Sequence, residues 1–292
     1  MVVPTNLYKY MSLDTAKIVL KTGRLRWQSP CQFNDVNEMQ RMPRLEPEYN
    51  EAWLIYARTL VDLIYNKNIV DFTAYSPWTK QILLQILQLN IFFYSEEDAL
   101  KNIEKKIPTC ESEIGDRLRK TTESKNDGTL RCFCLSEDEN NATMWAHYGD
   151  VHKGCMFGFG HIEEKDTQFL AAEKVSYTAE PPVVGSALDV LLYGPSPALN
   201  KKTRLAIFFN KEINWSYEKE WRVMINRSAP NQEKFSDLLF YPEELTSVTF
   251  GSKVQDKDRE EILKLIEHSY PHCEVFEIKL HNGASTRVQL NG

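Results

Sequence analysis

The sequence predicts an α+β protein, with a mixed β-sheet and a helical insertion in one domain over residues 1–292. Three observations predict this fold class. Segments near both ends of the chain alternate apolar and polar residues with the period of two that is typical of strands. Residues 46–125 instead repeat apolar residues at helical spacing. The 292 residues are 42% hydrophobic and 26% charged, which is a globular composition.

The N-terminal segment predicts a strand, a helix and a second strand. Residues 6–10 form an aromatic strand, and Ser12 caps the helix that follows, which Gly23 ends. The second strand covers residues 24–27. A turn is expected at residues 33–35, because Asn and Asp side chains bond to their own backbone.

Residues 46–125 predict four helices. The first carries Trp53 and Leu60 at helical spacing, and the others begin at Pro77, at Ser95 and after Pro108. A loop is expected at residues 124–128. No residue of this insertion suggests chemistry, so we expect a cap, a lid or an interaction surface.

The rest of the chain returns to the sheet pattern. Strands are expected at residues 130–136, 155–159, 175–177, 247–250 and 275–280, and helices at residues 141–148, 196–209 and 256–269. No internal repeat and no low-complexity tract is found.

Composition narrows the function classes. The longest apolar runs are far shorter than the roughly 20 residues of a membrane span, so no membrane partner is expected. Residues 1–6 lack the features of a signal peptide, and the six cysteines form no Cys-x-x-Cys motif, which predicts a cytoplasmic protein with reduced thiols. The net charge of −6 argues against broad non-specific nucleic-acid binding. With 12 glycines the chain has neither a G-x-G-x-x-G motif nor a P-loop, which argues against Rossmann-type and kinase-like nucleotide binding.

The segment 215–225 predicts a turn that enters a strand. Its Trp, Val and Ile residues alternate to form one buried face. Glu218, Glu220 and Arg222 share the opposite face. Because burying a carboxylate is costly unless it is paired, this pattern predicts either an ion-pair ladder on a solvated edge strand or a functional site.

Four motifs carry a resemblance to a known family. The chain resembles a large bacterial family of cytoplasmic domains of unknown function, whose genes often lie near phage-defence genes. The resemblance runs from Leu7 to Leu280, with the helical insertion as the variable part. The motifs are Leu7-Tyr8-Lys9-Tyr10, Phe33-Asn34-Asp35, Trp145-x-x-Tyr148-Gly149-Asp150-x-His152-x-Gly154 and Trp215-x-Tyr217-Glu218-x-Glu220-Trp221-Arg222.

The order of the motif strands is also similar to that of the ADP-ribosyltransferase superfamily. This resemblance implies a split sheet that binds NAD as a substrate, with no metal. It places Tyr8 and Tyr10 on the first strand, where Lys9 stands in for the family's His or Arg, and Ser136 on the middle strand. It makes Glu220 the catalytic carboxylate, with Glu218 two residues before it.

Other side chains are candidates through their own chemistry. Arg24 and Arg26 share a strand face and could meet phosphates. Trp145 and Tyr148 could stack on nicotinamide or adenine, or belong to the core. We predict one common cleft, and its walls are expected to contain Tyr8 or Tyr10, Arg24 or Arg26, Tyr148, His152, Glu218 or Glu220, and Arg222.

Three function classes follow from these patterns. The first is an NAD-using ADP-ribosyltransferase or glycohydrolase, acting as a toxin or phage-defence effector on a protein, a nucleic acid or water. The second is a metal-dependent nuclease that uses His147, Asp150 and His152, although the two histidines lack H-E-x-x-H spacing and a structural role is the alternative. The third is a non-catalytic sensor whose helical insertion binds a partner protein.

Overall fold

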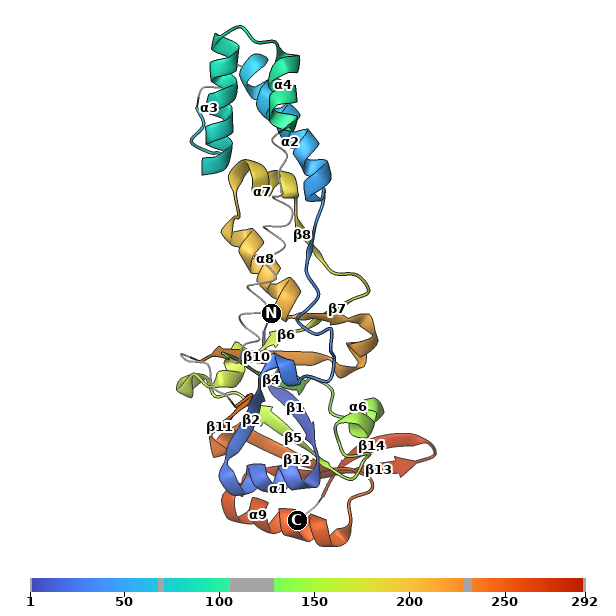
Figure 1. Ribbon diagram of the computed structural model, residues 1–292. Helices are drawn as coiled ribbons and strands as arrows, with labels where there is room; N and C mark the ends of the chain where they lie inside the picture. Colours follow the sequence, from blue (N-terminus) through green and yellow to red (C-terminus); the bar gives the residue numbers. More distant parts are fainter. Residues whose placement is uncertain (1, 68–70, 106–128, 228–232, 291–292) are drawn as a thin grey trace. The chain divides into compact units, whose positions relative to one another are not determined.

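The computed structural model describes residues 2–67, 71–105, 129–227 and 233–290. Their contacts divide the chain into two compact units, whose elements are labelled in Figure 1. The α+β unit comprises residues 1–38, 125–179 and 211–292, and the helical unit comprises residues 39–124 and 180–210. Each unit has its own hydrophobic core.

The α+β unit contains a ten-stranded sheet. Eight strands follow the order β11-β2-β4-β1-β5-β12-β13-β14, while β10 pairs with β4 and β6. β12 and β13 are parallel and the other described pairs are antiparallel, so the sheet is mixed, as predicted. The strands are β1 (Asn6–Met11), β2 (Arg24–Gln28), β4 (Leu130–Ser136), β5 (Cys155–Gly160), β6 (Glu173–Lys174), β10 (Glu220–Asn226), β11 (Phe235–Leu239), β12 (Leu245–Phe250), β13 (Glu274–His281) and β14 (Ala284–Gln289).

Strand β4 has two partners along one edge. β10 pairs with all of β4, from Leu130 to Ser136, so β1 and β2 must share the other edge. β2 meets β4 at Cys132 and β1 meets it at Ser136. Between these points the carbonyl of Cys134 accepts a hydrogen bond from Lys9 Nζ at 2.8 Å. The sheet is therefore split beside the middle of β4.

Two helices cover the core of this sheet. α1 (Leu13–Thr22) and α9 (Asp256–Ser269) lie side by side (Figure 1). Ser12 caps α1 and Gly23 ends it in a left-handed conformation, as the sequence predicts. Ala16, Leu20 and Ile262 are fully or almost fully buried in the core. The short helix α6 (Ala142–His147) buries Trp145, which packs edge-on against Tyr10.

The shorter elements of the α+β unit lie in the segments between the strands of the ten-stranded sheet. They are β7 (Ser176–Thr178), β9 (Asn210–Glu212) at the boundary with the helical unit, and the 3-10 helices η1 (Pro30–Gln32), η2 (Glu163–Lys165), η3 (Gln168–Ala171), η4 (Ile213–Glu218) and η5 (Pro242–Glu244).

The helical unit packs amphipathic helices around one core. Its core includes Leu60, Leu83 and Ala187, which are fully buried. The elements are α2 (Tyr49–Tyr65), α3 (Pro77–Ile91), α4 (Glu96–Glu104), α7 (Ala187–Tyr193), α8 (Pro197–Phe208) and a short parallel pair of β3 (Arg44–Leu45) with β8 (Val183–Gly185).

The helical insertion is larger than the sequence predicts. We expected residues 46–125 to form it within one domain, but residues 180–210 join it in a separate compact unit. The predicted fourth helix after Pro108 and the loop at residues 124–128 lie outside the described residues. No helix in the described part of the chain is long and apolar enough to cross a membrane.

Candidate functional site

Three predicted site residues lie in one row across neighbouring strands. In the antiparallel register, Tyr8 of β1 is opposite Ser136 of β4, and Ser136 is opposite Glu220 of β10. The Ser136 hydroxyl donates a hydrogen bond to the carbonyl oxygen of Glu218 at 2.7 Å. The sheet register therefore places residues 8, 136 and 220 directly opposite one another on three neighbouring strands.

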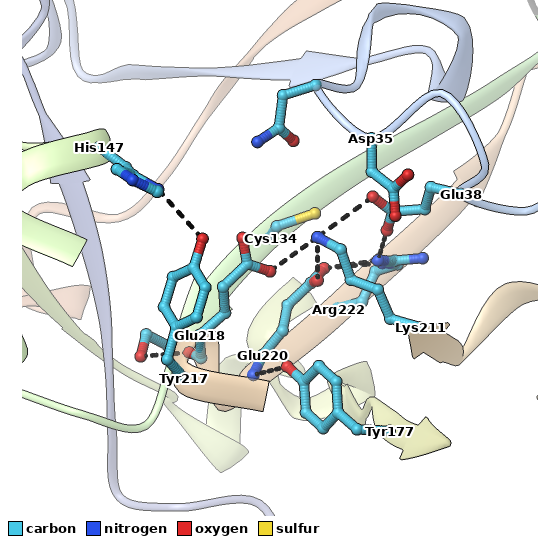
Figure 2. A network of polar contacts seen from close by, with 12 residues as sticks. Asp35, Glu38, Cys134, His147, Tyr177, Lys211, Tyr217, Glu218, Glu220 and Arg222 are labelled. Carbon is cyan, nitrogen blue, oxygen red and sulfur yellow. Dashed lines mark hydrogen bonds and ion pairs between the residues drawn. The ribbon is translucent and has the colours of Figure 1, made fainter. Parts of the chain in front are cut away.

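Next to this row lies a buried group of charges, which we call the ion cluster. It consists of Glu38, Lys211, Glu218, Glu220 and Arg222, and each residue is at most 7% exposed. Figure 2 shows Lys211 in the middle of the three carboxylates. Its Nζ lies 2.7 Å from Glu218 Oε2, 3.3 Å from Glu38 Oε2 and 3.8 Å from Glu220 Oε2.

Arg222 closes the other side of the ion cluster. Its Nε and Nη2 lie 2.9 Å and 2.7 Å from Glu220 Oε1, and Nη2 also donates to Glu38 Oε1 (Figure 2). Arg222 is fully buried, so these carboxylates, and not water molecules, stabilise its charge. The ion-pair ladder that the sequence suggested is thus present, but it is buried instead of lying on a solvated edge strand.

The ion cluster contains three carboxylates and two cations. If all five groups are charged, one negative charge is in excess. Burial opposes ionisation of Glu220, but Arg222 and Lys211 outweigh it and lower the pKa of Glu220. Burial raises the pKa of Glu38. The positive charge of Arg222 acts to lower this pKa, but the negative charges of Glu220 and Glu218 act in the opposite direction, so the pKa stays raised. Glu38 is therefore the carboxylate on which a proton is held most easily.

Local backbone geometry turns both glutamates of the Glu-x-Glu motif inward. Glu218 ends the 3-10 helix η4, and Lys219 between the two glutamates is left-handed, with φ of 44°. The N–H of Glu220 then donates to the hydroxyl of Tyr177 at 2.8 Å. Lys219 points away and pairs with Asp138 at 3.0 Å.

A cavity of about 560 Å³ opens beside the ion cluster, in the range of small-molecule sites. It lies along the split edge of β4, with walls from β1, α1, β2 and α6. Of the predicted site residues, eight line it: Tyr8, Lys9, Tyr10, Arg26, Ser136, Tyr148, Glu218 and Glu220. Lys211, Glu38 and His147 also line it.

Tyr148 connects the α6 wall to the ion cluster. Its hydroxyl donates to Glu218 Oε1 at 2.5 Å and accepts from Asn34 Nδ2 at 2.8 Å. Burial and the charge of Glu218 raise the pKa of Tyr148, so it remains a hydrogen-bond donor. Both oxygens of Glu218 are therefore held, by Tyr148 and Lys211. Of the three carboxylates, Glu220 forms the longest ion pair with Lys211, through its Oε2, and the Glu220 carboxylate also accepts a hydrogen bond from the Cys134 thiol.

The match to known families concerns this part of the chain. Residues 144–223 match the model of a family described as protein of unknown function, DUF2971. The matched segment contains every residue of the ion cluster except Glu38. This finding confirms a resemblance to a family of unknown function over residues 144–223. The wider extent of that resemblance, the link to phage defence and the resemblance to ADP-ribosyltransferases stay predictions. No curated protein and no solved structure matches the chain.

Four predicted site residues lie away from the cavity wall. Arg222 is buried behind Glu220, and Trp145 is buried against Tyr10. Arg24 donates to the carbonyl of Asp237 on the exposed side of β2. His152 belongs to a left-handed turn at residues 150–152, where burial and the charge of Lys253 lower its pKa.

The residues of the predicted nuclease site have separate surroundings. His147 Nδ1 is hydrogen-bonded to the hydroxyl of Tyr217 at 3.0 Å, Asp150 is exposed, and the His152 N–H donates to the carbonyl of Trp145. Within the described ranges, no group of three or more His, Cys, Asp or Glu residues is placed to hold a metal ion.

The sequence reasoning missed Glu38, Lys211 and Tyr177. Lys211 had a detectable signal, because it follows the apolar run Ile207-Phe208-Phe209 and a buried lysine needs a partner. Glu38 had no comparable signal, because its segment lacks clear periodicity. Tyr177 was predicted to lie in the strand at residues 175–177, but nothing near it in the sequence points to Glu220 as its partner.

Proposed function

We propose that this protein is an NAD-using enzyme of the ADP-ribosyltransferase or glycohydrolase type. The observation that carries the proposal is the row of Tyr8, Ser136 and Glu220 on three neighbouring strands, next to a cavity of small-molecule size. The resemblance predicted these three positions from their order in the chain. Their pairing in one register is independent support, because strand pairing cannot be read from that order.

The reaction requires a carboxylate near the ribose of NAD. The bond between nicotinamide and ribose breaks, nicotinamide leaves with the bonding electron pair, and positive charge develops on the ribose. A fixed carboxylate stabilises that charge electrostatically. When all five groups of the ion cluster are charged, it carries one excess negative charge, which a positive charge that develops on the ribose would balance.

We assign the catalytic role to Glu220 and a positioning role to Glu218. Glu220 lines the cavity, and its Oε2 is the carboxylate oxygen least occupied by Lys211. Glu218 uses its oxygens for Tyr148 and Lys211. We further propose that Lys9 faces the pyrophosphate, because it is a cation on the cavity wall. Arg26 also lines the cavity, but its guanidinium is paired with the carboxylate of Asp237.

The acceptor and the biological role follow from the resemblance. We propose that ADP-ribose is transferred to a protein or nucleic acid, or to water, and that the protein acts as a toxin or phage-defence effector in the cytoplasm. The alternative is a non-catalytic sensor or protein-interaction module, which would not cleave NAD.

The test is direct. Purified protein is incubated with NAD, and released nicotinamide is measured by liquid chromatography, while calorimetry measures NAD binding to the same preparation. We expect both binding and nicotinamide release. Binding without release over long incubation with candidate acceptors would favour the sensor, and absence of binding at millimolar NAD would refute the proposal.

A further inference from the structure

Helix α3 of the helical unit (Figure 1) has an exposed side without a charged residue. Its other side, with Ile82, Leu83 and Ile86, is buried in the core of the unit. The exposed residues recur at intervals of three or four and therefore form one stripe along the helix. This stripe, which we call the α3 face, consists of Trp78, Gln81, Leu84, Gln85, Gln88 and Ile91.

The α3 face continues into a run of exposed aromatic residues just after the helix. The exposed fractions of the apolar residues are 49% for Trp78, 52% for Leu84, 62% for Ile91, 73% for Phe92, 96% for Phe93 and 51% for Tyr94. If a whole aromatic side chain presents about 200 Å², the four aromatic residues alone expose about 500 Å². An apolar patch of this size on a soluble protein commonly marks a binding surface.

The charges next to the α3 face argue against two kinds of partner. Helix α4 begins directly after the aromatic run, and its first turn carries the exposed carboxylates of Glu96, Glu97 and Asp98. These carboxylates would repel the phosphates of a nucleic acid and the surface of an anionic membrane. The α3 face itself offers no charge to a charged partner. The partner that fits is therefore an uncharged, apolar protein surface.

The order of residues along the α3 face makes it complementary to a second copy of itself. Two α3 helices can pair antiparallel around a two-fold axis between residues 84 and 85. Trp78 of one copy then lies at the level of Ile91 of the partner subunit, and Gln81 lies at the level of Gln88 of the partner subunit. Apolar side chains meet at both ends of the contact. Between them, amides that carry both donors and acceptors meet each other, and no like charges are opposed.

We propose that the protein forms a symmetric dimer through antiparallel pairing of two α3 faces. Such a two-fold contact uses the same patch on both copies and is the commonest arrangement of protein dimers. A standard interface buries about 800 Å² per partner. The aromatic residues supply more than half of that area, and the other residues of the α3 face and its aromatic run can supply the rest. All residues of this contact belong to the helical unit, and the dimer does not depend on the proposed NAD chemistry.

Sedimentation equilibrium of the full chain tests the dimer. The molecular mass is measured from about 1 to about 100 µM protein, because interfaces of this size have Kd values in the micromolar range or below. We expect the mass to approach twice the 34.0 kDa of one chain. Leu84→Glu places two like charges beside the two-fold axis and should raise the Kd of the dimer about 10-fold or more. The matched control is Leu54→Glu on α2, where the leucine is 47% exposed, and it should dimerise like the parent.

A pair of opposite charges tests the two-fold arrangement itself. Leu84→Lys should also weaken the dimer when it is measured alone. An equimolar mixture of Leu84→Glu and Leu84→Lys should restore a dimer, because opposite charges then meet beside the axis. Phe93→Ser changes a side chain that is almost fully exposed, so it provides a further interface variant if the Leu84 variants do not fold. Circular dichroism and the Tm establish that each variant is folded.

Several results would overturn the dimer. The parent would stay monomeric over the whole concentration range, or Leu54→Glu would weaken the dimer as much as Leu84→Glu. A mixture of the two Leu84 variants that stays monomeric would exclude the antiparallel pairing. A monomeric parent that binds phosphatidylcholine vesicles, with binding lost in Phe93→Ser, would assign the α3 face to a membrane instead. None of these measurements uses NAD, so a monomer that releases nicotinamide refutes the dimer alone, and a dimer that releases none refutes the proposed reaction alone.

Discussion

Replacing Glu220 with glutamine separates a catalytic carboxylate from a structural one. The substitution preserves the size of the side chain and an oxygen that can accept from Arg222. It removes the charge that Arg222 contacts through two hydrogen bonds to Oε1. It also removes the excess negative charge, because two carboxylates then face Lys211 and Arg222.

The expected loss of stability is moderate. A hydrogen bond to a charged group contributes about 1.5–3 kcal/mol and a neutral one about 0.5–1.5 kcal/mol. Weakening two such bonds, with relief of one like-charge repulsion, therefore costs about 1–3 kcal/mol. For a domain of this size that corresponds to a decrease in Tm of roughly 3–10 °C, and the variant should remain folded at 25 °C.

The expected loss of activity is much larger. Removing one electrostatic catalytic group typically lowers the rate by about 10²–10³-fold. Nicotinamide release is measured per folded molecule at 25 °C, next to a thermal melt of the same preparation. Glu267→Gln, an exposed glutamate on α9, is the matched control and should keep the activity and Tm of the parent.

Two results would refute this reasoning. A Glu220→Gln variant that keeps parental nicotinamide release per folded molecule would remove Glu220 from the reaction. A variant that unfolds at 25 °C would show that Glu220 is needed mainly as the partner of Arg222, and that the charge count of the ion cluster was misjudged.

Three further predictions concern the fold around the site. Arg222→Gln should cost about 3–5 kcal/mol in urea denaturation, more than Glu220→Gln, because it leaves three buried carboxylates with Lys211 alone; an equal or smaller cost would contradict the charge count. Because the pKa of Glu38 is raised in the folded protein, its contribution to stability falls as pH rises. The free energy of unfolding of the parent, relative to Glu38→Gln, should thus decrease as the pH rises above about 4.5, the ordinary pKa of a glutamate, and a difference that is constant or increases with pH would refute this. Gly154→Ala should cost about 1–3 kcal/mol in the same assay, because its Cβ would collide with the Met11 carbonyl oxygen; parental stability would show that the loop adapts.

Local chemistry allowed many elements to be predicted from the sequence. The helix at residues 256–269 and the strand at 130–136 have the predicted bounds, since hydrophobic periodicity and terminal residues act within a few positions. The spacing of Glu218, Glu220 and Arg222 predicted that they share one side, but it did not predict that this side is buried. Strands β11 and β14 and helix α7 were missed because their short segments lack clear periodicity.

Only the tertiary structure decided which residues meet. Glu38 and Lys211 are about 170 residues apart in the sequence, and nothing local to either one specifies the other as its partner. Likewise, residues 180–210 carry their own helical pattern, but their place in the helical unit depends on packing against α2. Periodicity determines which side of an element is buried. The long-range pairing that brings Tyr8, Ser136 and Glu220 together depends on the sheet register, and the ion cluster depends on buried charges finding partners.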